Sequence, residues 1–267
     1  MASLSKYFIE NENIGLYEQI FENVNIMDCH THIGVDRDSH RLGAKQLVKM
    51  MASNDINQAI SFPLDDPKAG TDFSRPNERI RIAYRKYPKR IIPFFRLNPN
   101  HNWEKEFEKR TGQGFRGVKL HPRSQGFEIS AQAAMKLYDK MEKAGLILLI
   151  HAGFGLEYVA DELYKVAKAF PKLRIIIGHG GFVELDNVIK LLKERENILF
   201  DTSTMRVFDL MELMKNVSYR KITFGSDTPI YDQTLALQML VDSAAIAKQT
   251  PNQVRSMLGE NLQKWLK

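Results

Sequence analysis

The sequence contains a single cysteine, Cys29, and no apolar stretch long enough to cross a membrane. One cysteine cannot form an internal disulfide, so packing or a metal ion must hold the fold together. A membrane helix needs about 20 consecutive apolar residues, and residues 1–19 lack the apolar core of a signal peptide. These absences predict a cytoplasmic protein with no membrane segment.

The charge also lacks any block of one sign. The formal net charge is +6, but basic and acidic residues alternate, as in KLLKERE at 190–196. Because no basic stripe or recognition motif is present, the sequence argues against nucleic-acid binding. The surplus of positive charge favours a small anionic partner instead.

Short apolar, β-branched runs recur along the chain with amphipathic stretches between them. This alternation is typical of parallel strands joined by helices, and eight strands fit the ~250 residues of a barrel. The sequence therefore predicts one (β/α)₈ barrel domain, a TIM barrel, over residues 1–267. The expected strands are residues 24–30, 56–62, 91–97, 117–121, 146–151, 173–179, 198–203 and 221–227.

Helical periodicity and helix-end residues mark the segments between these runs. A first helix at 15–23 is expected outside the barrel or over its bottom, and Thr250-Pro251 is expected to begin the last helix. The other helices with clear patterns are residues 77–87, 130–144, 157–170, 183–195 and 206–216.

Five of the seven histidines fall at or just beyond the ends of expected strands. His30, His121, His151 and His179 are the final residues of their runs, and His32 follows His30. In a parallel barrel these strand ends meet at one mouth. The pattern predicts a functional site there.

Period-2 alternation predicts which way the side chains near the first strand point. His30 and His32 would both face the barrel interior, with Asp28 on the same side and able to orient one of them. Cys29 would face outward, under a helix. Asp227 ends the eighth run and would stand beside the first strand, which completes a set of nitrogen and oxygen metal ligands.

The strand-end sequences resemble those of a known family. MDCHTHIG, GVKLHP, LIHAG, IIGHGG and FGSDTP occur in that order, and LGENLQKWL ends the chain. Together they resemble the amidohydrolase superfamily, in its amidohydrolase-related branch. The resemblance implies that His30, His32, His151 and Asp227 bind a divalent metal, with Zn²⁺ expected. His179 is then either a catalytic acid or base, or a ligand of a second ion.

Lys119 in GVKLHP bears on the number of ions. In binuclear members of the superfamily a lysine on the fourth strand is carboxylated and bridges two metals, and this pattern is similar. His121 shares the direction of Lys119 and competes for a role at the site. We favour a single ion, with Asp227 as the base that accepts a proton from water and His179 as the group that carries it.

Two arginines follow neighbouring strands. Arg96 and Arg123 are each expected either to bind a substrate carboxylate, with His121 beside them, or to pair with an acidic neighbour such as Asp201. The expected function is metal-dependent hydrolysis of a small lactone, cyclic amide, ester or amide that carries a carboxylate. The alternatives are a non-oxidative decarboxylase and a metal-binding barrel without turnover. The sequence leaves a homo-oligomer open.

Overall fold

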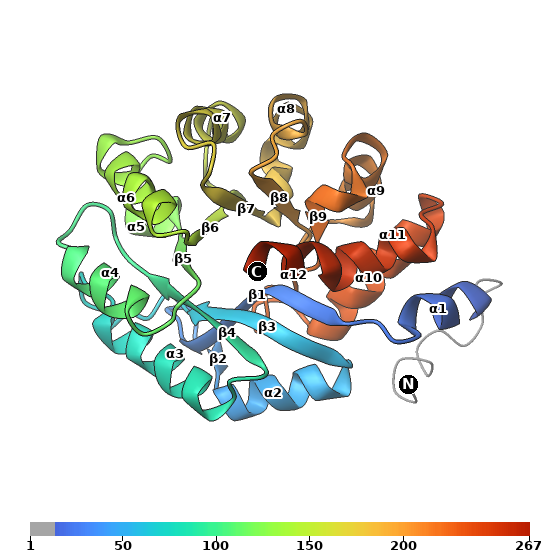
Figure 1. Cartoon of the computed structure of the whole chain (residues 1–267), viewed down its shortest axis with the longest axis horizontal. Helices are drawn as coiled ribbons and strands as arrows, with labels where there is room; N and C mark the ends of the chain where they lie inside the picture. Colours follow the sequence, from blue (N-terminus) through green and yellow to red (C-terminus); the bar gives the residue numbers. More distant parts are fainter. Residues whose placement is uncertain (1–13) are drawn as a thin grey trace.

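The computed structural model describes residues 14–267, which form one curled sheet surrounded by helices (Figure 1). The strands match the expected runs in number and order, with one short addition, β2. They are β1 (Ile26–Val35), β2 (Arg41–Leu42), β3 (Ile56–Pro63), β4 (Ile91–Arg96), β5 (Gly117–Leu120), β6 (Ile147–His151), β7 (Arg174–Gly178), β8 (Ile198–Asp201) and β9 (Ile222–Thr223).

The helices also follow the predicted alternation, and most ends fall within two or three residues of those expected. They are α1 (Ile14–Phe21), α2 (Ala44–Ser53), α3 (Ser74–Lys86), α4 (Glu104–Thr111), α5 (Pro122–Gln125), α6 (Gln132–Lys143), α7 (Val159–Ala169), α8 (Leu185–Leu192), α9 (Val207–Asn216), α10 (Gln233–Ile246), α11 (Pro251–Arg255) and α12 (Asn261–Leu266). Shorter helical turns cover His179–Glu184, Tyr219–Lys221 and Ser256–Glu260.

The sheet runs in the order β2-β1-β3-β4-β5-β6-β7-β8-β9, and all pairs except the β1–β2 hairpin are parallel. The ring closes through backbone hydrogen bonds between β1 and the segment after β9. Cys29 N donates to Phe224 O at 2.9 Å, and Asp227 N donates to His30 O at 2.8 Å. This closure confirms the (β/α)₈ barrel and places Asp227 beside the first strand.

Alternate strand residues pack into two different clusters. Residues such as Phe94, Leu149 and Leu199 form a cluster inside the barrel, whereas their neighbours Phe95 and Ile150 pack with the helices outside. Both faces of the strands are therefore apolar, as expected where a parallel sheet is covered on both sides.

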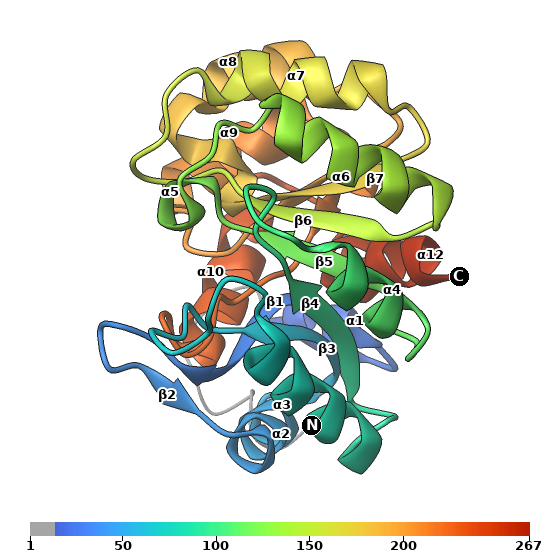
Figure 2. The ribbon, with the colours of Figure 1, turned by 90° about the vertical axis from the view of Figure 1, so that its left-hand side faces the viewer.

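The two ends of the barrel differ. Figure 2 shows α12 at the end opposite to the β2 hairpin and α5. The mouth lies on the side of β2 and α5, because α5 directly follows the carboxyl end of β5. Helix α1 lies outside the ring beside α11, where Pro251 follows the cap Thr250 as expected. Among residues 14–267, no helix is both long and apolar enough to span a bilayer.

A bulge interrupts β1 between two of its pairs with β3. The pairs on either side of it are Asp28 with Ala59 and Thr31 with Ser61. Three steps along β1 therefore match two along β3, and β1 holds one extra residue there. A bulge of this kind shifts the alternation of side chains beyond it.

The bulge makes two predictions from strict alternation wrong. Cys29 is buried in the cluster inside the barrel, not under an outer helix. Asp28 faces α10, where it accepts a hydrogen bond from Gln233 Nε2 at 2.9 Å, so it does not reach an imidazole of β1. His30 and His32 lie beyond the extra residue, and both face the mouth.

Candidate metal centre

His30 is held by a carboxylate on β8, which is separated from β1 by β9 in the closed ring. Its Nδ1 lies 2.6 Å from Oδ2 of Asp201, the last residue of β8, and both side chains are buried. A carboxylate at this distance keeps the proton on Nδ1 and leaves the Nε2 lone pair free for a metal. The structure thus contradicts the pairing of Asp201 with an arginine and gives it a role as the orienting partner of His30.

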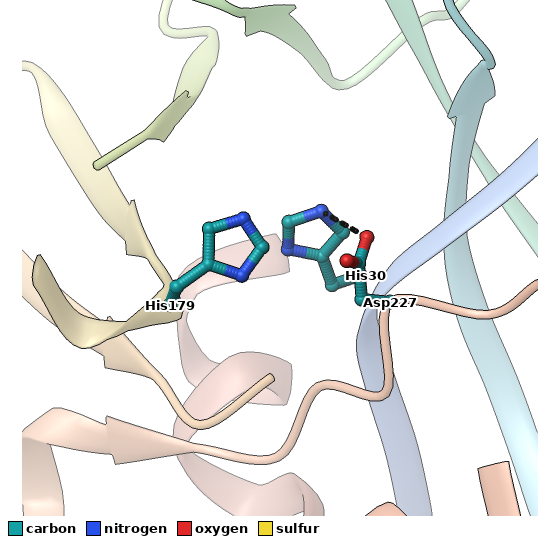
Figure 3. Close-up of side chains that lie close together, drawn as sticks. All are labelled: His30, His179 and Asp227. Atoms are coloured by element: carbon teal, nitrogen blue, oxygen red, sulfur yellow. Dashed lines mark ion pairs between the residues drawn. The ribbon is translucent and has the colours of Figure 1, made fainter. Parts of the chain in front are cut away.

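Asp227 faces the free nitrogen of His30. Its Oδ1 is 3.1 Å from His30 Nε2 (Figure 3). The same oxygen is 2.9 Å from His32 Nε2. Burial opposes the charge of Asp227, but the surrounding imidazoles, led by His30, outweigh it and hold the pKa of the carboxyl well below its usual range. Asp227 is therefore an ionised oxygen donor.

His179 approaches the same point from the other side of the mouth (Figure 3). Its Nδ1 is 3.0 Å from Ser203 Oγ and 3.0 Å from Thr204 Oγ1, and its Nε2 is 3.0 Å from His151 Nδ1. Burial lowers the pKa of His179 to about 4, so the ring is neutral at pH 7 and can act as a ligand.

The local sequence explains how His179 reaches this position. His179, Gly180 and Gly181 have consecutive positive φ angles of 61°, 60° and 71°. A Cβ at Gly180 would lie 2.7 Å from Met205 Sδ, so the close turn needs glycine there. The IIGHGG motif thus turns the chain sharply at the end of β7 and aims the imidazole into the mouth.

Three side chains can share one ion in this arrangement. His30, His179 and Asp227 each offer one ligand atom, and these atoms lie within 4.8 Å of one another. Imidazole nitrogen with carboxylate oxygen is a donor set suited to Zn²⁺ and similar divalent ions. Burial and Lys119 oppose the charge of His30, but Asp201 and Asp227 outweigh them and raise its pKa, so a cation would replace a proton that these carboxylates attract. Together with the neutral His179 and the ionised Asp227, this arrangement fits a metal.

The other two predicted ligands lie next to this group. His32 contacts Asp227, burial lowers the pKa of His32 to about 4, and within residues 14–267 its buried Nδ1 has no hydrogen-bond partner. His151 contacts the group through its Nδ1, which lies 3.0 Å from His179 Nε2. Burial also holds the pKa of His151 far below its usual range, so this ring is neutral as well.

His121 stacks on His151, with ring centroids 3.9 Å apart. Its Nδ1 accepts a hydrogen bond from Ser124 N at 3.3 Å, which places the proton on Nε2. Burial, followed by the nearby Arg96, lowers the pKa of His121 to about 2. His121 therefore extends the row of neutral imidazoles from His179 and His151 toward the arginine.

Lys119 lies against His30, one of the candidate metal ligands. Its Nζ is 3.3 Å from His30 Nε2 and lies over the ring of Phe62, 5.0 Å from the centroid. The side chain is almost completely buried, and burial lowers the pKa of Lys119 to about 7. A large fraction of this amine is uncharged at neutral pH, which is the form that can react with carbon dioxide.

The two predicted anion-binding arginines lie in different environments. Arg96 is buried at the end of β4, next to Lys119 in register, and its Nη2 is 3.5 Å from Asp65 Oδ1. Within residues 14–267, Arg96 Nε has no hydrogen-bond partner. Arg123 is exposed, and its Nη1 donates to Phe154 O at 3.5 Å.

Sequence reasoning missed the residues that orient the imidazoles. Ser203 and Thr204 follow β8 and hold His179, and Asp201 holds His30. The available signal was that Asp201 lies two residues after the inward-facing Leu199, so alternation aims it into the barrel.

The chain also matches a known protein family over most of its length. The amidohydrolase family matches residues 27–267, which is most of the chain, and the protein belongs to this family. No curated protein matches it in sequence.

Several solved structures share the fold. One is a probable 2-pyrone-4,6-dicarboxylic acid hydrolase from Acinetobacter baumannii with citric acid bound, at 14% identity and TM-score 0.66, covering 91% of this chain and 99% of that chain. Another is 5-carboxyvanillate decarboxylase from Sphingomonas paucimobilis, at 12% identity and TM-score 0.69, covering 91% and 99%. A third is a dihydroxybenzoic acid decarboxylase from Polaromonas sp. JS666 with bound manganese and the inhibitor 2-nitroresorcinol, at 15% identity and TM-score 0.70, covering 91% and 97%.

Proposed function

We propose that the protein is a metal-dependent hydrolase that cleaves a small lactone, cyclic amide, ester or amide bearing a carboxylate. The observation that carries this proposal is the convergence of His30, His179 and Asp227 on one point. Asp201 engages Nδ1 of His30, and Ser203 and Thr204 engage Nδ1 of His179, which leaves both Nε2 atoms as the candidate donors, with His179 Nε2 also 3.0 Å from His151 Nδ1.

The proposed site holds Zn²⁺ or a similar divalent ion, with His32 and His151 available beside the central three residues. When bound, such an ion lowers the pKa of a coordinated water to ~7 and polarises a carbonyl. With His179 among the residues that would hold the ion, Asp227 would accept the proton of the water on its carboxylate and deliver it to the leaving group. Ser203 and Thr204 keep the ring of His179 in place during this transfer.

We assign the recognition of the substrate carboxylate to Arg96 in preference to Arg123. A buried guanidinium with a free Nε–H has donors to offer, and its fork matches a carboxylate. Asp65 is partly exposed and 3.5 Å away, so it compensates the charge of Arg96 only in part. An anionic substrate would complete the compensation and leave its carbonyl free to face the metal ligands.

The first test measures metal content and turnover together. The purified protein should hold at least one divalent ion per chain, and removal by a chelator should abolish turnover while circular dichroism stays unchanged. The double variant His30→Ala, His32→Ala should lose the ion, and His101→Ala on the exposed surface is the matched control. Full metal retention in the double variant would exclude this site.

The alternative function is a non-oxidative decarboxylase. Its support is that two of the similar structures described above are decarboxylases. Hydroxybenzoic acids and carboxylated lactones should be tested side by side, with carbon dioxide and acid release both measured. Release of acid without carbon dioxide would support the hydrolase. Release of carbon dioxide would refute the hydrolase and support the decarboxylase. Metal bound without either product would leave a non-catalytic barrel.

The arginine assignment has its own test. Arg96→Met should reduce kcat/KM on an acidic substrate about 10–100-fold, because a charge-assisted hydrogen bond contributes ~1.5–3 kcal/mol. The neutral ester or amide of the same substrate should be affected little, and Arg123→Met is the control. Equal losses on the acid and the neutral compound would refute the assignment.

We also propose a cytoplasmic location. Cys29 is a free, buried thiol, and burial raises its pKa well above the usual range. A barrel stabilised without disulfides suits a reducing compartment. Fractionation of cells that express the protein would test this.

A further inference from the structure

Asp28 is a buried carboxylate that accepts four hydrogen bonds on the side of β1 facing away from the mouth. Its Oδ1 accepts from His30 N and from Ser226 N, each at 3.0 Å. Its Oδ2 accepts from Ser226 Oγ at 2.6 Å and from Gln233 Nε2 at 2.9 Å. Two donors therefore satisfy each oxygen, and the side chain is fully buried.

These four bonds join β1 to two neighbouring segments near the other end of the chain. His30 belongs to β1, Ser226 to the loop after β9, and Gln233 to the first turn of α10. Ser226 immediately precedes Asp227 and is 198 residues from Asp28. The carboxylate of Asp28 thus links the backbone at one metal ligand to the residue next to another.

Backbone hydrogen bonds also tie the Asp227 segment to β1: Asp227 N donates to His30 O at 2.8 Å, and His32 N donates to Thr228 O at 2.9 Å. Strand β9 ends at Thr223, and beyond it the segment pairs with β1 only through an isolated bridge between Thr31 and Thr228. Asp227 also has a φ of 64°, a conformation that costs a non-glycine residue of order 1 kcal/mol and persists only where its surroundings impose it. Two bonds from Ser226 to Asp28 act directly on this turn.

We propose that Asp28 is a positioning residue for the metal centre: it fixes His30 and Asp227 relative to each other without touching the ion. The inference rests on the proposed metal site. The bulge in β1 makes this role possible, because it turns Asp28 outward while His30 faces the mouth. Asp28 therefore acts on the ligands from behind, through their backbone.

The test exchanges a donor and an acceptor across the Asp28–Gln233 contact. In Asp28→Asn, an amide NH₂ replaces one oxygen and opposes the NH₂ of Gln233. We expect the Kd for Zn²⁺, measured by competition with a chromophoric chelator, to rise about 10–100-fold. Absorption bands of the Co²⁺-loaded protein should shift, because they report ligand geometry.

The double variant Asp28→Asn, Gln233→Glu restores the match, since the carboxylate introduced on α10 accepts from the amide introduced on β1. The hydroxyl of Ser226 can then accept from the same amide and donate to His30 O, which is 3.5 Å away. We expect the double variant to recover most of the Zn²⁺ affinity and the Co²⁺ spectrum. Failure of this recovery in a folded double variant would refute the proposal.

Asn197→Ala is the control for a purely structural loss. Asn197 is buried just before β8, and its Nδ2 donates to three carbonyl oxygens, among them Phe170 O at 3.0 Å. The variant Asn197→Ala should be less stable than the wild type but should have the same Kd for Zn²⁺. If Asp28→Asn behaves like this control, Asp28 only stabilises the fold and the proposal is wrong.

Two further outcomes are decisive. If Asp28→Asn does not fold, Gln233→Met takes its place: a weaker Kd supports the proposal and an unchanged Kd refutes it. If the wild-type protein does not bind Zn²⁺ or Co²⁺ at all, the proposed metal function fails first, and the inference fails with it. The wild-type measurement therefore separates the two failures.

Discussion

Asp201 offers the sharpest test of the proposed metal centre, because this one carboxylate determines which nitrogen of His30 carries the proton. Asp201 Oδ2 lies 2.6 Å from His30 Nδ1 and 2.7 Å from Ser203 Oγ, and the side chain is fully buried. Burial opposes its charge, but His30 outweighs this and holds the pKa of Asp201 below its usual range. At neutral pH the residue is therefore ionised and can only accept hydrogen bonds.

The change Asp201→Asn removes this property with almost no change in shape. Ser203 N donates to Oδ1 at 2.9 Å, so one amide orientation sets two N–H groups against each other. The other orientation points the new NH₂ at His30 Nδ1, which moves the ring proton to Nε2 and blocks the nitrogen proposed to bind the metal. Each orientation loses a charge-assisted hydrogen bond, which contributes ~1.5–3 kcal/mol. Since ~1.4 kcal/mol is a factor of ten, the Kd for Zn²⁺ should rise roughly 10–150-fold.

The assay is competition for Zn²⁺ against a chromophoric chelator, at pH 7 and with folding checked by circular dichroism. Asp209→Asn is the matched control, because it makes the same chemical change at a carboxylate that pairs with the exposed Arg206. The control should bind Zn²⁺ like the wild type. A Kd for folded Asp201→Asn within about twofold of the wild-type value would show that His30 does not depend on Asp201 for metal binding.

Three further predictions concern stability and metal content. In the folded, metal-free protein the pKa of Lys119 is about 7, whereas in the unfolded chain it is ~10.4. Between these two pH values the unfolded chain therefore binds more protons than the folded one. Wild-type stability should therefore rise relative to Lys119→Met from pH 7 to pH 9.5, on the order of 1–3 kcal/mol by urea unfolding, and parallel profiles would contradict this. Arg110→Met should lower the free energy of unfolding by about 3–5 kcal/mol, because it leaves the buried carboxylate of Glu106 without its cationic partner. Arg81→Met removes a more exposed ion pair and should lower it by at most about 1 kcal/mol. If a crystal structure shows two ions, Lys119 should be carboxylated and His179 should bind the second; two ions beside an unmodified Lys119 with no other bridging anion would refute this.

The strand order and the site at the strand ends were predictable because both depend on local patterns. Apolar runs such as the one ending at His151 are short and bounded, so their lengths identify strands. Parallel strands bring their carboxyl ends together whatever the details of packing. The histidine positions therefore indicated a shared mouth before any contact was known.

The orientation of side chains within β1 could not be predicted in the same way. One extra residue between Asp28 and Thr31 reverses the alternation, and nothing in CHTH marks a bulge. The partners of His30 and His179 were also hidden, since Asp201 and Ser203 meet them only when the barrel closes. Such contacts depend on register between distant strands, which one sequence does not fix.

Polar contacts on the outside of the barrel hold Arg96 and can therefore affect the proposed substrate site. Asn77 on α3 accepts from Arg96 N at 2.8 Å and donates to Arg96 O at 2.9 Å and to Glu106 Oε1 at 3.0 Å. Glu106 in turn accepts from the buried Arg110. The end of β4 is thus held by a polar network outside the barrel, and we expect loss of Arg110 to loosen the strand that carries Arg96. A variant can therefore change the affinity for anions without losing a contact to them. Such a change shows that Arg96 contacts the anion only if Arg96→Met produces it and leaves the stability of the fold unchanged.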